Sequence, residues 1–551
     1  MAGWLTWRFR GQALDDFFIT YRYSQNLAAG RGFVFNAGER VFALTNPGLA
    51  LALALGRLVT GIEVPVLASA LSGLALLAVA AVLLREAQMV ERAPEAWLGG
   101  TLLVTASFLW VLQGGEGMAM LALLLLAARW GDSRPVLAGL LAGLAAWFRP
   151  EAAVGAGLLA VLVWRERKRL PWRLAAAAAA VVLLGVLLAW WYFGTPIPNS
   201  LAAKRALAAG SSGLRFWPQS VELARRHAGR LWPAVVGLGL LGQWPLMRDG
   251  GRCLRLLSCF GLSLAVLYPL LGVAYAPWYV LPTAAALLYG LAFLIGFLAR
   301  LAARAGAGAA GAAAPAGRML ALAGAVAACA PVAFSLAPAE ARRLHRFSWP
   351  PHMRAYREAA AWLKAHAPPA ATVSYDEVGA LGYFSDRTVI DMVGVVTPEL
   401  LPYVQRRDFA GAFLARPGDF ALCPDRDPWM PVGAGWFQRA YRPVATFGEG
   451  GKLILFERRP EVPLPPAHRL ARGEAANRSS SPAPRQCPAL RVEIAACDAI
   501  QPAAEARLLR APASRSSGRA GPPVAPAGRR RPAPLPPAPG PRRRRSSGPA
   551  R

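Results

Sequence analysis

Two adjacent carboxylates near the start of the chain, Asp15 and Asp16, are the side chains best suited to chemistry. They lie just before the first apolar run and are followed by aromatic residues, Arg22 and a glycine-rich turn. In such a pair, one aspartate can accept the proton of an attacking hydroxyl while the other orients it or holds a cation. Helix capping and a solvated surface are the alternatives for an isolated pair, so the surrounding residues must decide.

A second group of polar residues occurs at the ends of separate apolar runs. Its members are Glu116, Arg149, Glu151, Asn199 and Lys204. Ionisable groups this close to hydrocarbon are costly and usually functional. Arginine and lysine suit a phosphate group, and carboxylates can activate a hydroxyl. A structural ion-pair cluster is the alternative for the first three residues, and loop solvation for the last two.

A metal site and an aromatic platform are further candidates. Asp15, Asp16 and Glu116 offer hard oxygen ligands for a divalent cation, although nothing in their spacing requires one. Trp278 and Tyr279 could stack on a sugar or lipid, or could belong to an interfacial aromatic belt. Serine-hydrolase, P-loop and dinucleotide-binding motifs are absent from the sequence, and the five histidines form no triad or metal pair. No other cofactor is predicted, and nucleotide-driven chemistry is disfavoured.

The elements that must position these residues are membrane helices. The 551 residues are 55% hydrophobic and 17% charged, with a mean hydropathy of +0.34. Soluble domains carry about 25% charged residues, and disordered chains are far less apolar. The net charge is +30, of which the last 91 residues contribute +12 through 17 arginines. The remainder lies largely in loops between apolar runs, so nucleic acid is not an expected partner.

Ten apolar runs are predicted to cross the membrane. They are residues 64–84, 96–112, 117–130, 135–148, 151–164, 174–193, 231–247, 254–273, 277–299 and 318–337. Positive charge marks cytoplasmic loops, and the strongest such loop is 165–173, which reads RERKRLPWR. The alternate breaks, including 194–230, then face outward. This phasing holds if the short run 47–61 is an interfacial or re-entrant helix.

Four domains follow from this pattern. Residues 1–46 form a first outer loop with the Asp–Asp pair, and residues 47–339 form the transmembrane domain. Residues 340–460 predict a small extracytoplasmic α/β domain, with amphipathic helices at 352–366 and 398–407 and five strands separated by Pro and Gly, at 371–378, 387–393, 419–424, 441–447 and 452–458. Residues 461–551 are a disordered Pro/Arg-rich tail. Because residues 11–46 are placed outside and the first ten residues are too short and polar to span, we expect a further helix to precede the sequence given.

Residues 14–47 resemble the first outer loop of integral-membrane glycosyltransferases of the GT-C superfamily, most closely the branch with the mycobacterial terminal arabinofuranosyltransferases. The matches include Asp15, Asp16, Arg22, Asn26, Asn36, Glu39 and Pro47. Phe42 stands where that branch has a glutamate. Similar segments follow at 114–120 (GGEGMAM), 148–151 (FRPE), 193–204 (FGTPIPNSLAAK) and 376–394 (DEVGALGYFSDRTVIDMVG).

The resemblance implies a GT-C-like polytopic α-helical fold and transfer of a sugar from a polyprenyl-phosphate-linked donor to a cell-envelope glycan or lipid, with inversion. Asp15 and Asp16 would be catalytic, with Asp15 favoured as the base. The donor-phosphate and substrate-binding residues would be Arg22, Glu116, Arg149, Glu151, Asn199, Lys204, Trp278 and Tyr279. The protein would lie in the inner membrane among its lipids, with the active site and the α/β domain outside.

Two alternatives remain open at this stage. A transporter or flippase of lipid-linked glycans should carry polar residues in broken helices at mid-membrane, often within an internal repeat. Here the polar residues lie at outer helix ends, no repeat is apparent, and a sizeable α/β domain follows, which favours an enzyme. A non-catalytic relative is kept open by Phe42 and by the absence of a first helix.

Overall fold

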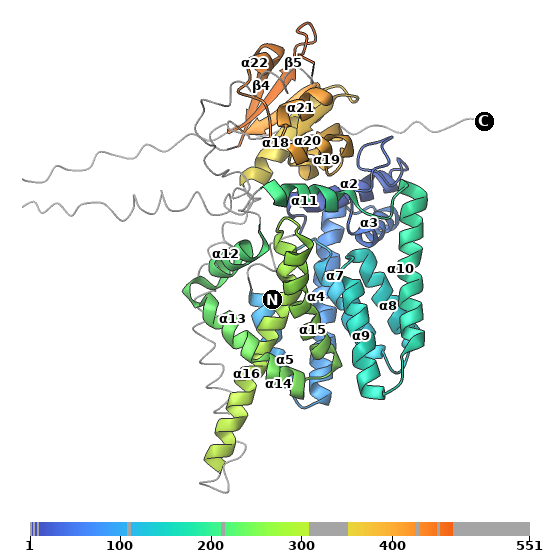
Figure 1. The fold of residues 1–551 in the computed structure, drawn as a ribbon, viewed down its shortest axis with the longest axis vertical. Coiled ribbons are helices and arrows are strands. Elements are labelled where there is room, and N and C mark those ends of the chain that lie inside the picture. The colour runs from blue at the N-terminus through green and yellow to red at the C-terminus, as the bar shows by residue number, and fades with distance from the viewer. Residues whose placement is uncertain are drawn as a thin grey trace, which may run out of the picture. The chain divides into compact units, whose positions relative to one another are not determined.

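The computed structural model describes residues 3, 6, 7, 10–106, 112–210, 215–307, 351–424, 429–448 and 452–466 (Figure 1). All of them belong to one compact unit. Apolar helices come first in the chain and a mixed α/β domain follows, as predicted. The predicted span 318–337, the tail beyond residue 466, and a Cys487–Cys497 bridge that the sequence would permit lie outside the described residues.

Within the described residues, four segments are long and apolar enough to cross a membrane by length and composition. They are α4 (Val64–Met89), α10 (Trp172–Phe193), α15 (Arg252–Leu271) and Pro277–Ala302, which joins η3 (Pro277–Val280) to α16 (Leu281–Ala307). Shorter helices accompany them: α3 (Pro47–Thr60), α5 (Ala93–Thr105), α7 (Gly117–Trp130), α8 (Pro135–Phe148) and α9 (Ala152–Arg167). The chain is a multi-pass membrane protein, and the number of ten crossings stays a prediction.

Small residues let α8 approach α10 closely. A Cβ at Gly143 would lie 2.7 Å from the carbonyl oxygen of Ala178, and a Cβ at Gly139 would lie 2.7 Å from the Cβ of Ala177. Two glycines four residues apart form the small-residue motif that brings membrane helices together. The pairing positions the end of α8, which Arg149 follows directly.

The predicted span 231–247 is not a single helix. It forms α13 (Trp232–Leu241) and α14 (Gln243–Asp249), which meet at Gly242. Both helices pack against α16. A side chain at Gly242 would collide with the backbone of Gly290 in α16, so the chain passes this point only with a glycine. The Gln243 amide donates to the carbonyl oxygen of Ala286 at 3.0 Å, which anchors the start of α14.

The five predicted strands of the α/β domain are all confirmed. They are β1 (Thr372–Tyr375), β2 (Thr388–Asp391), β3 (Phe420–Pro424), β4 (Tyr441–Phe447) and β5 (Leu453–Arg458). Their order in the sheet is β2-β1-β3-β5-β4, in which β1 pairs in parallel with β2 and β3 and the other pairs are antiparallel. Helix α19 (Val378–Ser385) connects β1 to β2, as parallel neighbours require.

Two apolar cores hold the α/β domain. One contains Ile390, Phe413 and Phe437 and includes side chains of α21 (Phe409–Ala415) and α22 (Gly435–Ala440). The other contains Val373 and Leu363, the latter from α18 (Pro351–His366), and continues into the membrane helices. Helix α20 (Leu401–Arg406) follows η4 (Pro398–Leu400) within the predicted helical stretch 398–407.

Helices α2 (Asp15–Ala28) and α11 (Asn199–Gly210) contact the α/β domain through α19 and α20. Helix α12 (Phe216–Ala228), which is followed by η2 (Gly229–Leu231), packs against α13 and α15. Helix α2 packs against α19 of the α/β domain, and the Phe18 ring meets the Tyr383 and Phe384 rings at 5.4 and 5.1 Å. The α/β domain therefore sits directly on the helix that carries the Asp–Asp pair.

Candidate active site

Asp15 and Asp16 occupy the first turn of α2, where the partial positive charge of a helix N-terminus favours carboxylates. Asp15 is buried, and both of its oxygens are engaged by the start of α19. The backbone N–H of Gly379 donates to Oδ2 at 2.9 Å, and that of Ala380 donates to Oδ1 at 2.7 Å. Asp15 therefore binds a second helix terminus across the interface between two parts of the chain.

Gly379 makes this approach feasible. Any Cβ at this position would collide with the backbone carbonyl oxygen of Asp15, so only glycine allows the two helix starts to meet. Burial, together with a smaller effect of the neighbouring Asp16 carboxylate, raises the pKa of Asp15 to about 6, against the two amide donors that lower it. Asp15 thus costs more to ionise here than an aspartate in water.

Asp16 has different surroundings. Its side chain is one-third exposed, and the Lys204 ammonium of α11 lies 3.2 Å from Oδ2. That ammonium also lies over the Trp278 ring, 4.6 Å from its centroid, and 5.8 Å from the Tyr279 centroid. Cations bind aromatic faces at these distances. Four sequence-predicted residues from three elements therefore meet at one accessible place.

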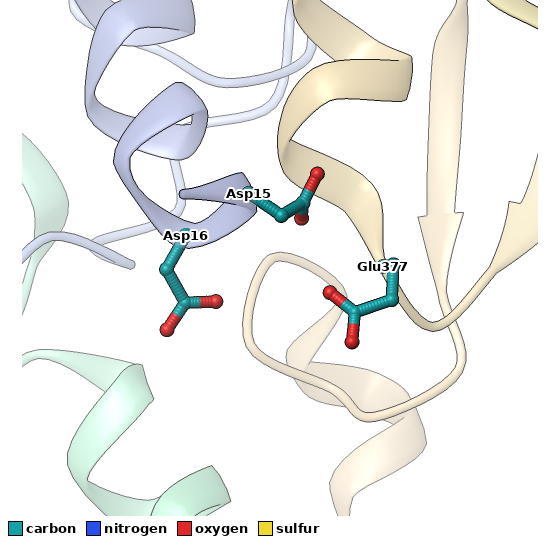
Figure 2. A group of neighbouring side chains, drawn as sticks. All are labelled: Asp15, Asp16 and Glu377. Atoms are coloured by element: carbon teal, nitrogen blue, oxygen red, sulfur yellow. The ribbon is translucent and has the colours of Figure 1, made fainter. Parts of the chain in front are cut away.

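Glu377 joins the two aspartates and was not predicted. One carboxylate oxygen from each of Asp15, Asp16 and Glu377 lies within 4.8 Å of the others, and Figure 2 shows Glu377 projecting toward the aspartates from the α/β domain. Asp16 and Glu377 are partly exposed, whereas Asp15 is buried. Glu377 is the second residue after β1, within the segment 376–394 that resembles the family, and this place in the sequence was the available signal.

The predicted ligand set for a divalent cation is wrong in one member, because Glu116 does not belong to this group. Its two carboxylate oxygens accept bonds from Asn46 at 3.0 Å and from Arg149 at 2.7 Å. The three grouped carboxylates do offer the hard oxygen donors that Mg²⁺ and Ca²⁺ prefer. The oxygens of Asp15 already accept backbone amides, so Asp16 and Glu377 would supply the more available ligand atoms.

Arg149, Glu116 and Glu151 form a separate, buried ion-pair cluster. The Arg149 guanidinium contacts both carboxylates and donates to the Tyr268 hydroxyl at 3.1 Å. The cluster ties together the ends of α7, α8, α9 and α15. With two carboxylates around one guanidinium, it presents no spare positive charge to a phosphate. It still borders the first group, because the Arg149 guanidinium carbon lies 5.1 Å from the Tyr279 ring centroid.

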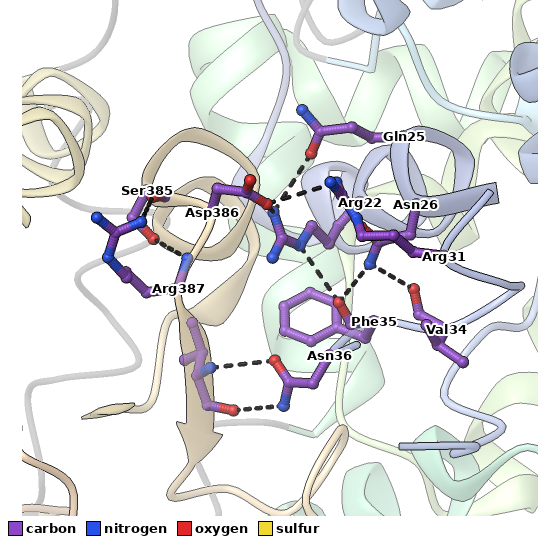
Figure 3. A network of polar contacts seen from close by, with 11 residues as sticks. Arg22, Gln25, Asn26, Arg31, Val34, Phe35, Asn36, Ser385, Asp386 and Arg387 are labelled. Carbon is purple, nitrogen blue, oxygen red and sulfur yellow. Dashed lines mark hydrogen bonds and ion pairs between the residues drawn. The ribbon is translucent and has the colours of Figure 1, made fainter. Parts of the chain in front are cut away.

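Arg22 and Asn199 hold the α/β domain in place. The Arg22 guanidinium pairs with Asp386 at 2.6 Å and donates to the carbonyl oxygen of Phe35 at 3.2 Å (Figure 3). The Asn199 amide donates to the carbonyl oxygens of Gly394 and Val395 at 2.6 and 2.8 Å. Both residues are thus engaged with protein groups, and their predicted binding of donor or substrate remains untested.

Comparisons with known proteins agree with a GT-C fold. Residues 346–465 match a family model described as a domain of unknown function (DUF8728). No curated protein matches the chain in sequence. The apo crystal structure of ArnT from Cupriavidus metallidurans aligns with a TM-score of 0.50 and 13% identity, over 84% of this chain and 97% of that one. The sequence-predicted GT-C-like fold is therefore confirmed at the level of fold.

Two further structures align less closely. ArnT from the same organism bound to undecaprenyl phosphate gives a TM-score of 0.49 and 14% identity, over 84% of this chain and 98% of that one. The Archaeoglobus fulgidus oligosaccharyltransferase with Zn and sulfate gives 0.45 and 13%, over 75% and 64%. ArnT and this oligosaccharyltransferase are both GT-C glycosyltransferases. The arabinofuranosyltransferase branch does not appear among these similar structures, so that narrower resemblance stays a prediction.

Proposed function

We propose that the protein is a membrane glycosyltransferase that moves a sugar from a polyprenyl-phosphate-linked donor to a hydroxyl of a cell-envelope glycan or lipid. The observation that carries the proposal is the partly exposed Asp16–Lys204 pair, which lies against Trp278 at the start of the apolar segment Pro277–Ala302. A base, a cation for phosphate and a ring for a sugar or lipid are thus adjacent. The GT-C fold supports the same conclusion.

In the proposed reaction, the acceptor hydroxyl attacks the anomeric carbon of the donor sugar. A bond forms between the acceptor oxygen and that carbon, and the bond from the carbon to the lipid-phosphate oxygen breaks with inversion. The proton of the hydroxyl passes to an aspartate carboxylate. Lys204 neutralises the charge that builds on the departing phosphate, which is the usual way a positioned cation lowers such a barrier.

The geometry favours Asp16 over Asp15 as the base. Asp16 is reachable from outside the protein, whereas both oxygens of Asp15 accept bonds from buried backbone amides. A general base must come within hydrogen-bond reach of the proton that it abstracts. The initial preference for Asp15 is replaced on this ground.

The identity of the sugar is proposed from the family resemblance, and the side of the membrane from the positive charges between the apolar runs. Arabinofuranose is the sugar that the resemblance suggests. The arginine-rich loop 165–173 supports an outer-face site in the inner membrane. A divalent cation at Asp16 and Glu377 would supply further charge neutralisation, and the residue roles above hold without it.

The test is sugar transfer by membranes that contain the full chain, with a panel of polyprenyl-phosphate sugars as donors. We expect Asp16→Asn to lower the rate by roughly 10²-fold or more, on the scale of losing a general base. Lys204→Met should lower it similarly, while Lys364→Met, which removes an exposed lysine of α18, should not. Full activity in the double variant Asp15→Asn/Asp16→Asn would overturn the site.

A further inference from the structure

We propose that the α/β domain is part of the transfer site: Glu377 orients the acceptor, and Asp15 is the positioning residue that holds Glu377 beside Asp16. This inference rests on the proposed function. It assigns different roles to the two aspartates of the motif and adds a residue from a domain more than 300 positions away in the sequence.

The first argument is placement. Asp16 contacts Lys204 of α11 on one side and lies within 4.8 Å of the Glu377 carboxylate on the other (Figure 2). The cation marks the side that suits the donor phosphate, so the side of the α/β domain is left for the acceptor. A partly exposed carboxylate there can accept a hydrogen bond from a sugar hydroxyl.

The second argument is the position of Glu377 in the sheet. It follows β1, which pairs in parallel with β2 and β3, so it lies at the carboxyl edge of the parallel strands. Ligand-binding side chains of α/β domains gather at this edge. In this protein, that edge is the one that meets α2, because α19 begins there and receives the Asp15 carboxylate.

The third argument is how firmly the edge is held. Asp15 accepts the N–H groups of Gly379 and Ala380, which lie two and three residues after Glu377, and a side chain at Gly379 would break this contact. Further bonds fasten the domain nearby. Asn36 binds Val389 and Arg22 binds Asp386 (Figure 3), and Asn199 binds Gly394. Glu377 is thus fixed by a rigid interface, and Asp15 is its nearest anchor.

The kinetic test uses the full chain in membranes and varies donor and acceptor separately. Glu377→Gln should raise the KM for acceptor roughly 10- to 100-fold, the range expected for losing a hydrogen bond to a charged group, and leave the KM for donor unchanged. Glu377→Asp should recover part of this loss. The matched control is Glu457→Gln, which removes a partly exposed carboxylate, paired with Arg442, from the same sheet.

The role of Asp15 is tested by non-additivity. If Asp15 acts through Glu377, then Asp15→Asn raises the KM for acceptor, and the double variant Asp15→Asn/Glu377→Gln is no worse than Glu377→Gln alone. Gly379→Ala, which changes no charge, should show the same acceptor defect. Multiplying defects in the double variant, or a wild-type KM for acceptor in Glu377→Gln, would overturn the inference.

A second measurement does not depend on activity. In a chain whose native cysteines are replaced, Asp16→Cys and Glu377→Cys should cross-link with a short bifunctional thiol reagent, and adding Asp15→Asn should lower the yield several-fold. If the wild type transfers no sugar but this result holds, the proposed function fails while the placement stands. If no cross-link forms with Asp15 intact, the placement itself is wrong.

Discussion

At the scale of single residues, two neighbouring aspartates have separate surroundings because they lie about 100° apart around a helix. Asp15 faces the α/β domain and accepts two amide hydrogen bonds, whereas Asp16 faces Lys204 and open space. A motif of two carboxylates can therefore contain one anchor and one reactive group. Substituting either residue would lower activity, so loss of activity alone does not distinguish the two roles.

Phe42, which departs from the pattern of the resembling family, has a packing role. Its ring is buried and stacks on Phe193 at 4.8 Å between centroids, and its carbonyl oxygen accepts the backbone N–H of Asn199. The residue therefore links the segment between α2 and α3 to the start of α11. Within the described structure, Phe42 thus helps to hold the start of α11, the helix that carries Lys204.

At the same scale, the buried His352 imidazole should make the free energy of unfolding depend on pH. Burial lowers its pKa from 6.5 to about 4, and its Nδ1 has no hydrogen-bond partner among the described residues. Because the folded state favours the neutral ring, the stability from this group is present above pH 6.5 and is lost as the pH falls toward 4. Between pH 7.5 and pH 5 the loss should be about 1–2 kcal/mol.

Thermal unfolding of the detergent-purified protein at the two pH values measures this loss. His352→Phe keeps a ring beside Tyr356 but cannot titrate, so its midpoint should fall less between pH 7.5 and pH 5 than that of the wild type. His366→Phe, which removes an exposed imidazole from the same helix, is the control. An equal fall in wild type and His352→Phe would assign the pH dependence to other groups.

At the scale of elements, the segment between α2 and α3 binds the edge of the α/β domain. Strand β2 is an edge strand, and the Asn36 side chain pairs with it as another strand would. Its amide donates to the carbonyl oxygen of Val389 at 2.9 Å, and the N–H of Val389 donates back at 3.1 Å. This pairing satisfies buried backbone groups and covers part of an exposed sheet edge.

Asn36→Ala should therefore loosen the domain. It leaves two backbone groups of Val389 without their partner, and we expect a loss of roughly 1–3 kcal/mol in the free energy of unfolding. Asn36→Asp keeps the acceptor but not the donor and should fall between Asn36→Ala and the wild type. Limited proteolysis and thermal unfolding measure the effect, with the exposed Gln405→Ala as control. Unchanged protease resistance in Asn36→Ala would contradict the inference that Asn36 holds the edge of the α/β domain.

The elements were more predictable than their contacts. Strand-like stretches separated by Pro and Gly identified all five strands, and long apolar runs identified α4, α10 and α15, because both signals are local. The break at Gly242 depends on Gly290, 48 positions away, and no local pattern contains it. For the same reason Glu116 was grouped with the aspartates in place of Glu377: both are acidic residues beside helix starts, and only the tertiary structure separates them.

At the scale of the whole molecule, α10 is the helix that best tests the membrane arrangement. Its 22 residues span about 33 Å at 1.5 Å per residue, close to the thickness of the hydrocarbon layer. Only 11% of its apolar window is buried inside the protein, so the remainder suits contact with lipid. The arginine-rich loop 165–173 precedes it, and the segment that carries Asn199 and Lys204 follows it.

If α10 crosses the membrane, its two flanks must face opposite compartments, and the positive loop should be cytoplasmic. Single cysteines at Leu170 and Ile197, which are 73% and 61% exposed, report each flank in a chain without other cysteines. In intact cells, an impermeant maleimide should label Ile197→Cys, and Leu170→Cys should react only after permeabilisation. Labelling of both in intact cells would show that α10 does not span. The reverse pattern would place Lys204 and the transfer site in the cytoplasm, where an outer-face reaction with a lipid-linked donor could not occur.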